Sequence, residues 1–100
     1  MNAHRHAVDD DREAIFLRLK EILTEIIGPD AAEIVGIRED SSFARDLEMD
    51  SIQIIAFAEQ ANALYGERFN FFEWVSKQPL KKLFGLTVGD IAALIAKGVS

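Results

Sequence analysis

Apolar residues recur at intervals of three and four in this chain, and that period constrains the fold more than any other feature. In residues 11–27 it draws one apolar stripe along a helix, formed by Ile15, Leu19, Ile22, Leu23, Ile26 and Ile27. Gly28 and Pro29 follow directly. They predict the end of this helix, because glycine accepts the left-handed conformation of a C-cap and proline cannot continue the helical hydrogen bonding.

The same period predicts a second helix from Ser51 to Tyr65, with Gly66 as its stop. Its buried side is expected to carry Ile54, Ile55, Ala58, Ala61, Leu64 and Tyr65. Asp50 precedes this helix and is a good N-cap, because a short carboxylate accepts the free N–H groups of the first turn.

Two shorter helical segments are predicted in the last third of the chain. Asn70 and Glu73 have the spacing of a capping box and predict a short helix before Pro79, with a further turn after it that ends near Gly85. A last helix is predicted over residues 87–98, where apolar positions again recur at helical spacing.

Residues 30–50 show no sustained period and predict a long ordered loop. Its expected anchors are the apolar residues Ile34, Val35, Ile37, Phe43 and Leu47. No strand pattern competes with the helices. The sequence therefore predicts an all-α fold: a small four-helix bundle with a long loop between helices 1 and 2 and an extended helix 3 region.

The composition suits one globular domain, with 100 residues of which 49% are hydrophobic and 28% charged. We expect a flexible N-terminal tail at residues 1–10 and the folded domain at residues 11–98. No apolar run approaches the ~18 residues that span a bilayer, and the polar first residues do not match an export signal. A cytoplasmic monomer without a membrane partner is expected.

Several kinds of chemistry are excluded by residue types. The chain has no cysteine, and its two histidines, His4 and His6, belong to the expected tail, so a serine nucleophile has no histidine base in the core. The net charge of −6 argues against nucleic-acid binding. Asp46, Glu48 and Asp50 lack the glycine and the later glutamate of a calcium loop. We therefore expect neither an enzyme nor a metal site.

The segment Asp46–Ile52, with the sequence DLEMDSI, delivers a serine to the beginning of the second helix. It resembles the D-L-G-x-D-S-L motif of acyl carrier proteins, in which the serine carries 4′-phosphopantetheine. The similarity extends from about Ile15 to Ala96 and includes the helix order and the segment LTVGD at 86–90. The resemblance implies a free-standing acyl carrier protein.

The same resemblance implies the chemistry of the site. A phosphopantetheinyl transferase would attach the arm of coenzyme A to Ser51, and the thiol of the arm would hold an acyl group as a thioester for acyl-loading and acyl-processing enzymes. The positive end of the helix dipole favours a phosphodiester at this position. Asp50 is assigned to transferase recognition and capping, and Met49 and Ile52 are expected to flank the arm.

The expected contacts with partner enzymes are Asp46, Glu48, Gln53, Ala56 and Glu59. Two departures from the family pattern affect them. Glu48 occupies the usual glycine position, so the loop lacks glycine's conformational freedom there. Glu59 is the only charge on a second helix that is strongly acidic in typical fatty-acid carriers. A second helix with so few acidic residues favours specialised partner enzymes, such as those of polyketide or related secondary-metabolite biosynthesis.

The stretch from Phe69 to Gly85 is longer and more aromatic than the corresponding region of fatty-acid carriers. Two interpretations stay open here: extra core packing, or an acyl pocket or partner surface shaped by Phe71, Phe72 or Trp74. Three lysines in or near this stretch are expected to form a solvated face: Lys77, Lys81 and Lys82.

Two alternative functions also remain. A peptidyl carrier that holds an amino acid would use the same serine and the same fold. A helical protein-interaction module without a prosthetic group would use Asp50 and Ser51 only to cap a helix.

Overall fold

A computed structural model of the chain describes residues 3–79, 81–82 and 85–98. Within these residues the regular elements are helices: α1 (Ala3–Ile27), α2 (Pro29–Val35), α3 (Ser51–Tyr65), α4 (Phe71–Ser76) and α6 (Val88–Lys97). The one pairing of strand type in the same residues is an isolated antiparallel bridge between Ser42 and Thr87. The predicted all-α class is confirmed. None of the described helices is long and apolar enough to cross a membrane.

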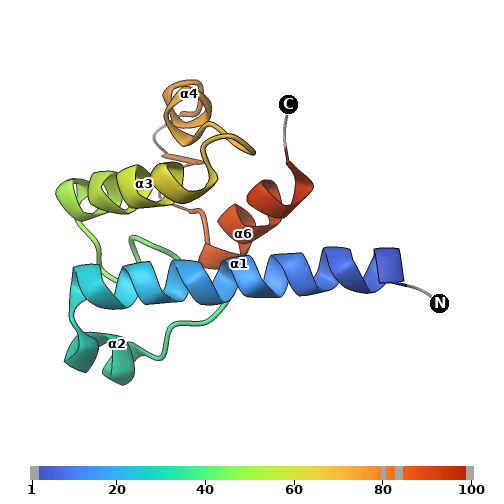
Figure 1. The fold of residues 1–100 in the computed structure, drawn as a ribbon. Helices are drawn as coiled ribbons and strands as arrows, with labels where there is room; N and C mark the ends of the chain where they lie inside the picture. Colours follow the sequence, from blue (N-terminus) through green and yellow to red (C-terminus); the bar gives the residue numbers. More distant parts are fainter. Residues whose placement is uncertain (1–2, 80, 83–84, 99–100) are drawn as a thin grey trace.

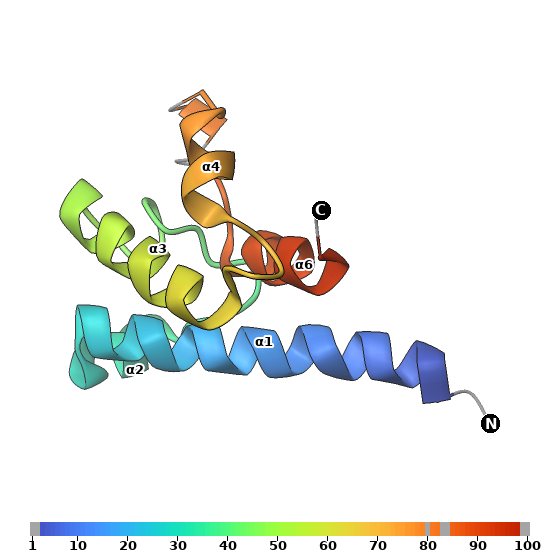
Figure 2. The ribbon, with the colours of Figure 1, turned by 45° about the horizontal axis from the view of Figure 1, so that its top comes forward.

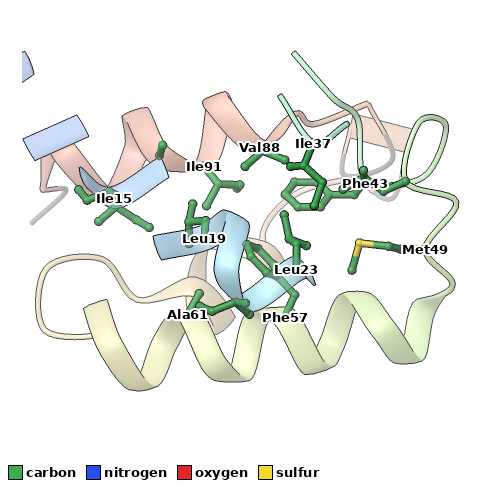
Figure 3. Packing of buried hydrophobic residues seen from close by; sticks show 14 of the residues in the cluster. Ile15, Leu19, Leu23, Ile37, Phe43, Met49, Phe57, Ala61, Val88 and Ile91 are labelled. Atoms are coloured by element: carbon green, nitrogen blue, oxygen red, sulfur yellow. The ribbon is translucent and has the colours of Figure 1, made fainter. Parts of the chain in front are cut away.

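Helix α1 is the axis of the molecule, and the other helices pack on it or on its neighbours. Both α3 and α6 lie against α1, α2 folds back beneath its C-terminal end, and α4 packs on α3 (Figures 1 and 2). The core fills the space between α1, α3 and α6, where Leu19, Leu23, Phe57 and Ile91 meet (Figure 3). This three-sided packing fixes α3 and thereby the residues at its N-terminal end.

The first helix starts earlier than the sequence predicted. It begins at Ala3, not at Asp11, because no glycine or proline interrupts the chain between these positions. The helix thus crosses the boundary drawn at residue 10 between a flexible tail and the domain, and that division stays a prediction. Its C-terminal end falls at Ile27 as predicted, and Gly28 follows with a φ of 99°.

A helix missing from the prediction, α2, occupies the beginning of the expected loop. Pro29 ends α1 but suits the first position of a new helix, and Gly36 closes α2 with a left-handed φ of 63°. Only Ala32 of this helix is buried, whereas Ile34 is 84% exposed. The predicted anchoring by Ile34 and Val35 is therefore wrong, while Ile37, Phe43 and Leu47 are buried as predicted.

The rest of the loop is held by backbone hydrogen bonds to the start of α6. The N–H groups of Val88 and Gly89 donate to the carbonyl oxygens of Ser41 (3.0 Å) and Glu39 (2.7 Å), and Phe43 N–H donates to Leu86 O (3.2 Å). These bonds satisfy N–H groups in the first turn of α6 that the helix itself leaves without acceptors. The loop is thereby ordered up to the residues that precede α3.

The buried face of helix α3 agrees in part with the predicted one, because Ala61 is buried and Ile54 and Tyr65 pack partly buried against the core as expected. Phe57 and Ala61 are buried, but Ile55 and Leu64 are 54% and 51% exposed. Apolar residues surround much of this helix, so their spacing alone does not show which side the core covers.

The aromatic stretch after α3 contributes mainly to the core. Asn70 caps α4 by accepting a hydrogen bond from Glu73 N–H at 3.1 Å. Phe69 and Phe71 are buried edge to face with ring centroids 4.9 Å apart, while Phe72 is exposed. The predicted turn after Pro79 includes residues 80 and 83–84, which lie outside the described residues.

Candidate functional site

Ser51 is the first residue of α3, and its side chain is exposed. The residues on either side of it form a complete capping box. Asp50 Oδ1 accepts a hydrogen bond from Gln53 N–H (2.8 Å), and Gln53 Oε1 accepts one from Asp50 N–H (3.2 Å). Asp50 and Gln53 therefore cap the helix between them, and the Ser51 hydroxyl is left outside the cap.

The electrostatic environment at this helix end favours an anion. Helix α3 has 15 residues and no acidic side chain in its first turn, and among the described residues the Asp50 carboxylate at its N-cap accepts only the Gln53 N–H. Its N-terminal end has the partial positive charge of the helix dipole, and the first N–H groups of any helix lack intrahelical acceptors. A phosphodiester joined to Ser51 would meet that positive end, so the residues present fit such a group.

The apolar neighbours of Ser51 behave differently from one another. Ile52 is 76% exposed, which suits a side chain expected to flank a flexible arm. Met49 is buried and differs from the expectation: its side chain extends into the core, and its N–H donates to Phe43 O at 3.0 Å (Figure 3). Exposed and buried residues alternate from Asp46 to Asp50, and Met49 is one of the buried ones, so it supports the site from beneath.

The loop before Ser51 is shaped by Asp46 and Glu48. Asp46 Oδ2 accepts a hydrogen bond from Ser42 N–H (2.8 Å), while the Ser42 hydroxyl accepts from Asp46 N–H (3.1 Å). Glu48 has a φ of 52°, the left-handed region, although it is not glycine. The loop therefore adopts a left-handed conformation at this position even though it lacks glycine's conformational freedom there. Asp46 thus acts in folding the loop, and Glu48 is exposed.

The predicted partner residues on α3 do not form a uniform surface. Glu59 is exposed, whereas Ala56 and Gln53 are half-buried and the Gln53 amide is engaged in the cap. Ile55, which the sequence assigned to the core, is exposed one turn after Ile52. Their spacing of three was the signal for a shared outward face, but the apolar character of both residues concealed it.

A small apolar cavity lies between α3, α4 and the start of α6. Its volume is about 50 Å³, and its lining is formed by Phe43, Ile54, Phe57, Ala58, Phe71, Val75, Leu86 and Ile91. Ile54 belongs to the first turn of α3, as Ser51 does. Phe71 thus packs in the core and also lines a cavity. For this residue, core packing and the shaping of a pocket are compatible.

The described residues contain no cluster of three or more histidine, aspartate or glutamate side chains that could hold a metal ion. The site consists of an exposed hydroxyl on a capped helix, an apolar neighbour and a nearby apolar cavity. Such an arrangement can present a covalently attached group to solvent.

Comparison with known proteins identified relatives over most of the chain. It is 36% identical over 87 residues to an acyl carrier protein of Rhodococcus erythropolis, which covers 86% of this chain and 82% of that protein. It is 33% identical over 87 residues to the meromycolate extension acyl carrier protein of Mycolicibacterium smegmatis, with 86% and 76% covered. No family model and no solved structure matches the chain.

Proposed function

Because this chain belongs to the acyl carrier protein family, we propose that Ser51 is the residue to which its 4′-phosphopantetheine is attached. Members of the family bear this group covalently, and they are carriers, not catalysts. The observation that supports the proposal is the exposed Ser51 hydroxyl at the first residue of α3, outside a cap that Asp50 and Gln53 complete.

A separate enzyme is required for the attachment. The Asp50 carboxylate accepts a hydrogen bond from Gln53 N–H, so it is oriented toward the helix backbone and away from the role of a base for Ser51. We propose that a phosphopantetheinyl transferase activates the Ser51 hydroxyl and supplies the arm from coenzyme A. Asp50 then acts by holding the first turn in shape for that enzyme.

The acyl group would be held as a thioester at the end of the arm. Ile54, in the first turn of α3, lines the apolar cavity, which at about 50 Å³ admits only a few atoms. A short acyl group fits this space, and a longer one requires α3 and α4 to separate or remains outside.

The exposed face of α3 is the proposed contact for acyl-loading and acyl-processing enzymes. Ile52 and Ile55 offer apolar area there, while Glu59 adds one charge. Glu48 and Asp46 are exposed on the loop before α3 and are proposed as further contacts, and Ala56 and Gln53 contribute only their half-exposed parts. Such a surface suits partner enzymes that bind through apolar contacts more than through ion pairs with acidic residues.

The pathway is proposed to be a dedicated one. The sparse charge of α3 supports polyketide or related secondary-metabolite biosynthesis, and the names of the mycobacterial relatives support acyl-chain extension. A loading assay distinguishes these routes, with malonyl, long-chain acyl and aminoacyl donors offered to the modified chain. Preference for an aminoacyl donor would instead identify a peptidyl carrier.

The attachment itself is tested by intact-mass analysis after incubation with coenzyme A and a broad-specificity transferase. We expect one added phosphopantetheine on the wild-type chain and none on Ser51→Ala. Ser76→Ala is the matched control, because Ser76 is also exposed on a helix, and it should be modified like the wild type. An unmodified wild-type chain would favour the interaction module without a prosthetic group.

A further inference from the structure

The charges of this acidic chain are distributed unevenly along its length. Residues 1–67 contain six basic and fifteen acidic residues, a net charge of −9. Residues 68–100 contain five basic and two acidic residues, a net charge of +3. Four of the five lysines belong to this last part. The part of the sequence that forms α4 and α6 therefore has a net charge opposite in sign to that of the part that contains Ser51.

An open groove lies between α4 and α6, with a volume of about 450 Å³. Its apolar residues are Trp74, Leu86, Ala93 and Leu94, and its charged residues are Lys82, Lys97 and Asp90. Trp74, Leu86 and Leu94 are half-buried and form a floor, whereas both lysines are exposed. We call these seven residues the α4–α6 groove.

The charges of the α4–α6 groove are available to a partner. Among the described residues, the ion pairs are made by Arg12, Arg18, Arg38 and Arg68, and none involves Lys82 or Lys97. Asp90 is already engaged, because its carboxylate accepts a hydrogen bond from Thr87 N–H at 3.1 Å in the cap of α6. The groove thus presents two lysines and one carboxylate, a net charge of +1, around an apolar floor.

The shape of the groove favours a helical segment over a small molecule. Its α6 residues are spaced by three and four, so it follows the helix for about two turns, or about 10 Å. Small-molecule sites enclose most of their ligand, whereas a long open groove suits an amphipathic helix that inserts one apolar ridge. Acidic residues beside that ridge would meet Lys82 and Lys97.

We propose that the α4–α6 groove docks an acidic amphipathic helix of a partner protein. In both ribbon views the first turn of α3 lies at the left of the molecule, whereas α6 runs toward the right, so its C-terminal end is the part farther from that turn (Figures 1 and 2). A partner bound in the groove therefore leaves Ser51 accessible. The inference is independent of the attachment at Ser51, because it rests on Trp74 of α4, on Lys82 and Leu86, and on residues of α6.

The single tryptophan of the chain, Trp74, reports directly on the groove. The probe is a synthetic 16-residue helix with leucine on one face and glutamate elsewhere, without tryptophan, titrated into the unmodified Ser51→Ala chain. We expect a saturable blue shift of Trp74 emission that weakens as salt is added. A peptide with lysine in place of every glutamate should bind at least about tenfold more weakly.

Charge-reversal variants test whether the acidic peptide binds in the α4–α6 groove. The variant K82E/K97E should lose about tenfold or more in affinity for the acidic peptide. K20E/R45E is the matched control, because it changes the net charge equally at exposed residues outside the groove and should lose less than about threefold. Circular dichroism checks that both variants fold. Equal losses in the two variants, or a Trp74 spectrum that the acidic peptide leaves unchanged, would overturn the proposal.

Discussion

At the residue scale, Glu48 shows how the loop keeps its shape without glycine. Its φ of 52° lies in the left-handed region, which a residue with a Cβ adopts at a cost of about 1 kcal/mol. The hydrogen bond from Met49 N–H to Phe43 O and the burial of Leu47 and Met49 hold the chain on both sides of it. Packing of the neighbours therefore imposes the conformation on Glu48.

Relief of this strain is measurable. Glu48→Gly should be more stable than Glu48→Ala by about 0.5 to 1 kcal/mol, because glycine removes the strain but gains entropy in the unfolded chain. Both variants lack the charge of Glu48, so the alanine variant is the proper reference. Urea unfolding gives the free energies, and an alanine variant at least as stable as the glycine variant would contradict the strain.

At the scale of elements, the contact between the loop and α6 is the least obvious part of the fold. A Cβ built on Gly89 would lie 2.8 Å from Glu39 O, and Gly89 N–H donates to that same oxygen. The backbone of the loop thus rests against a helix surface that only glycine leaves open. Through this contact α6 positions the segment that leads to Ser51.

Gly89→Ala should therefore destabilise the fold by about 1 to 3 kcal/mol, although alanine is the better helix former. Gly85→Ala is the matched control, because its added Cβ would lie 3.7 Å from Lys82 O, an ordinary contact distance. Thermal or urea unfolding compares the two. If Gly89→Ala is as stable as the wild type, the loop can move away from the added Cβ without a loss in unfolding free energy, which would contradict this prediction.

The sequence predicted the C-terminal end of α1 and both ends of α3, because these ends are chemically marked, but it missed the start of α1. Gly28 and Pro29 end α1, and Asp50 caps α3, so the position of Ser51 at a helix start could be predicted from the chain alone. Helix α2 was missed because its seven residues are too short to display a period. The exposed face at Ile55 and the approach of Gly89 to Glu39 depend on tertiary packing, which no local pattern contains.

At the scale of the whole molecule, an ion pair joins segments that are distant in sequence. Arg68, after α3, pairs with Asp11 of α1 and also donates to Ala96 O of α6 at 3.5 Å. The hydrogen bond from Arg68 lowers the pKa of Asp11, and its charge adds to the effect against the opposing influence of burial. Both side chains are more than one third exposed, so solvent screening keeps the contribution below about 1 kcal/mol.

The pH dependence of this ion pair has a definite sign. Because the folded pKa of Asp11 is lowered, its stabilisation is complete above the ordinary aspartate pKa of about 3.9 and is lost as the pH falls through the folded value. The wild type should exceed Asp11→Asn in unfolding free energy at pH 6, and this difference should shrink below about pH 4. Glu13→Gln, exposed on the same helix, is the control, and a difference independent of pH would contradict the pairing.

The central proposal is that 4′-phosphopantetheine is attached to the hydroxyl oxygen of Ser51. Fragmentation of the transferase-treated chain in a mass spectrometer tests it most directly, because it locates the added group on a single residue. The expected result is one phosphopantetheine on Ser51, with Ser41, Ser42 and Ser76 unmodified. Modification of another serine, or of none while the chain remains folded, would contradict the claim.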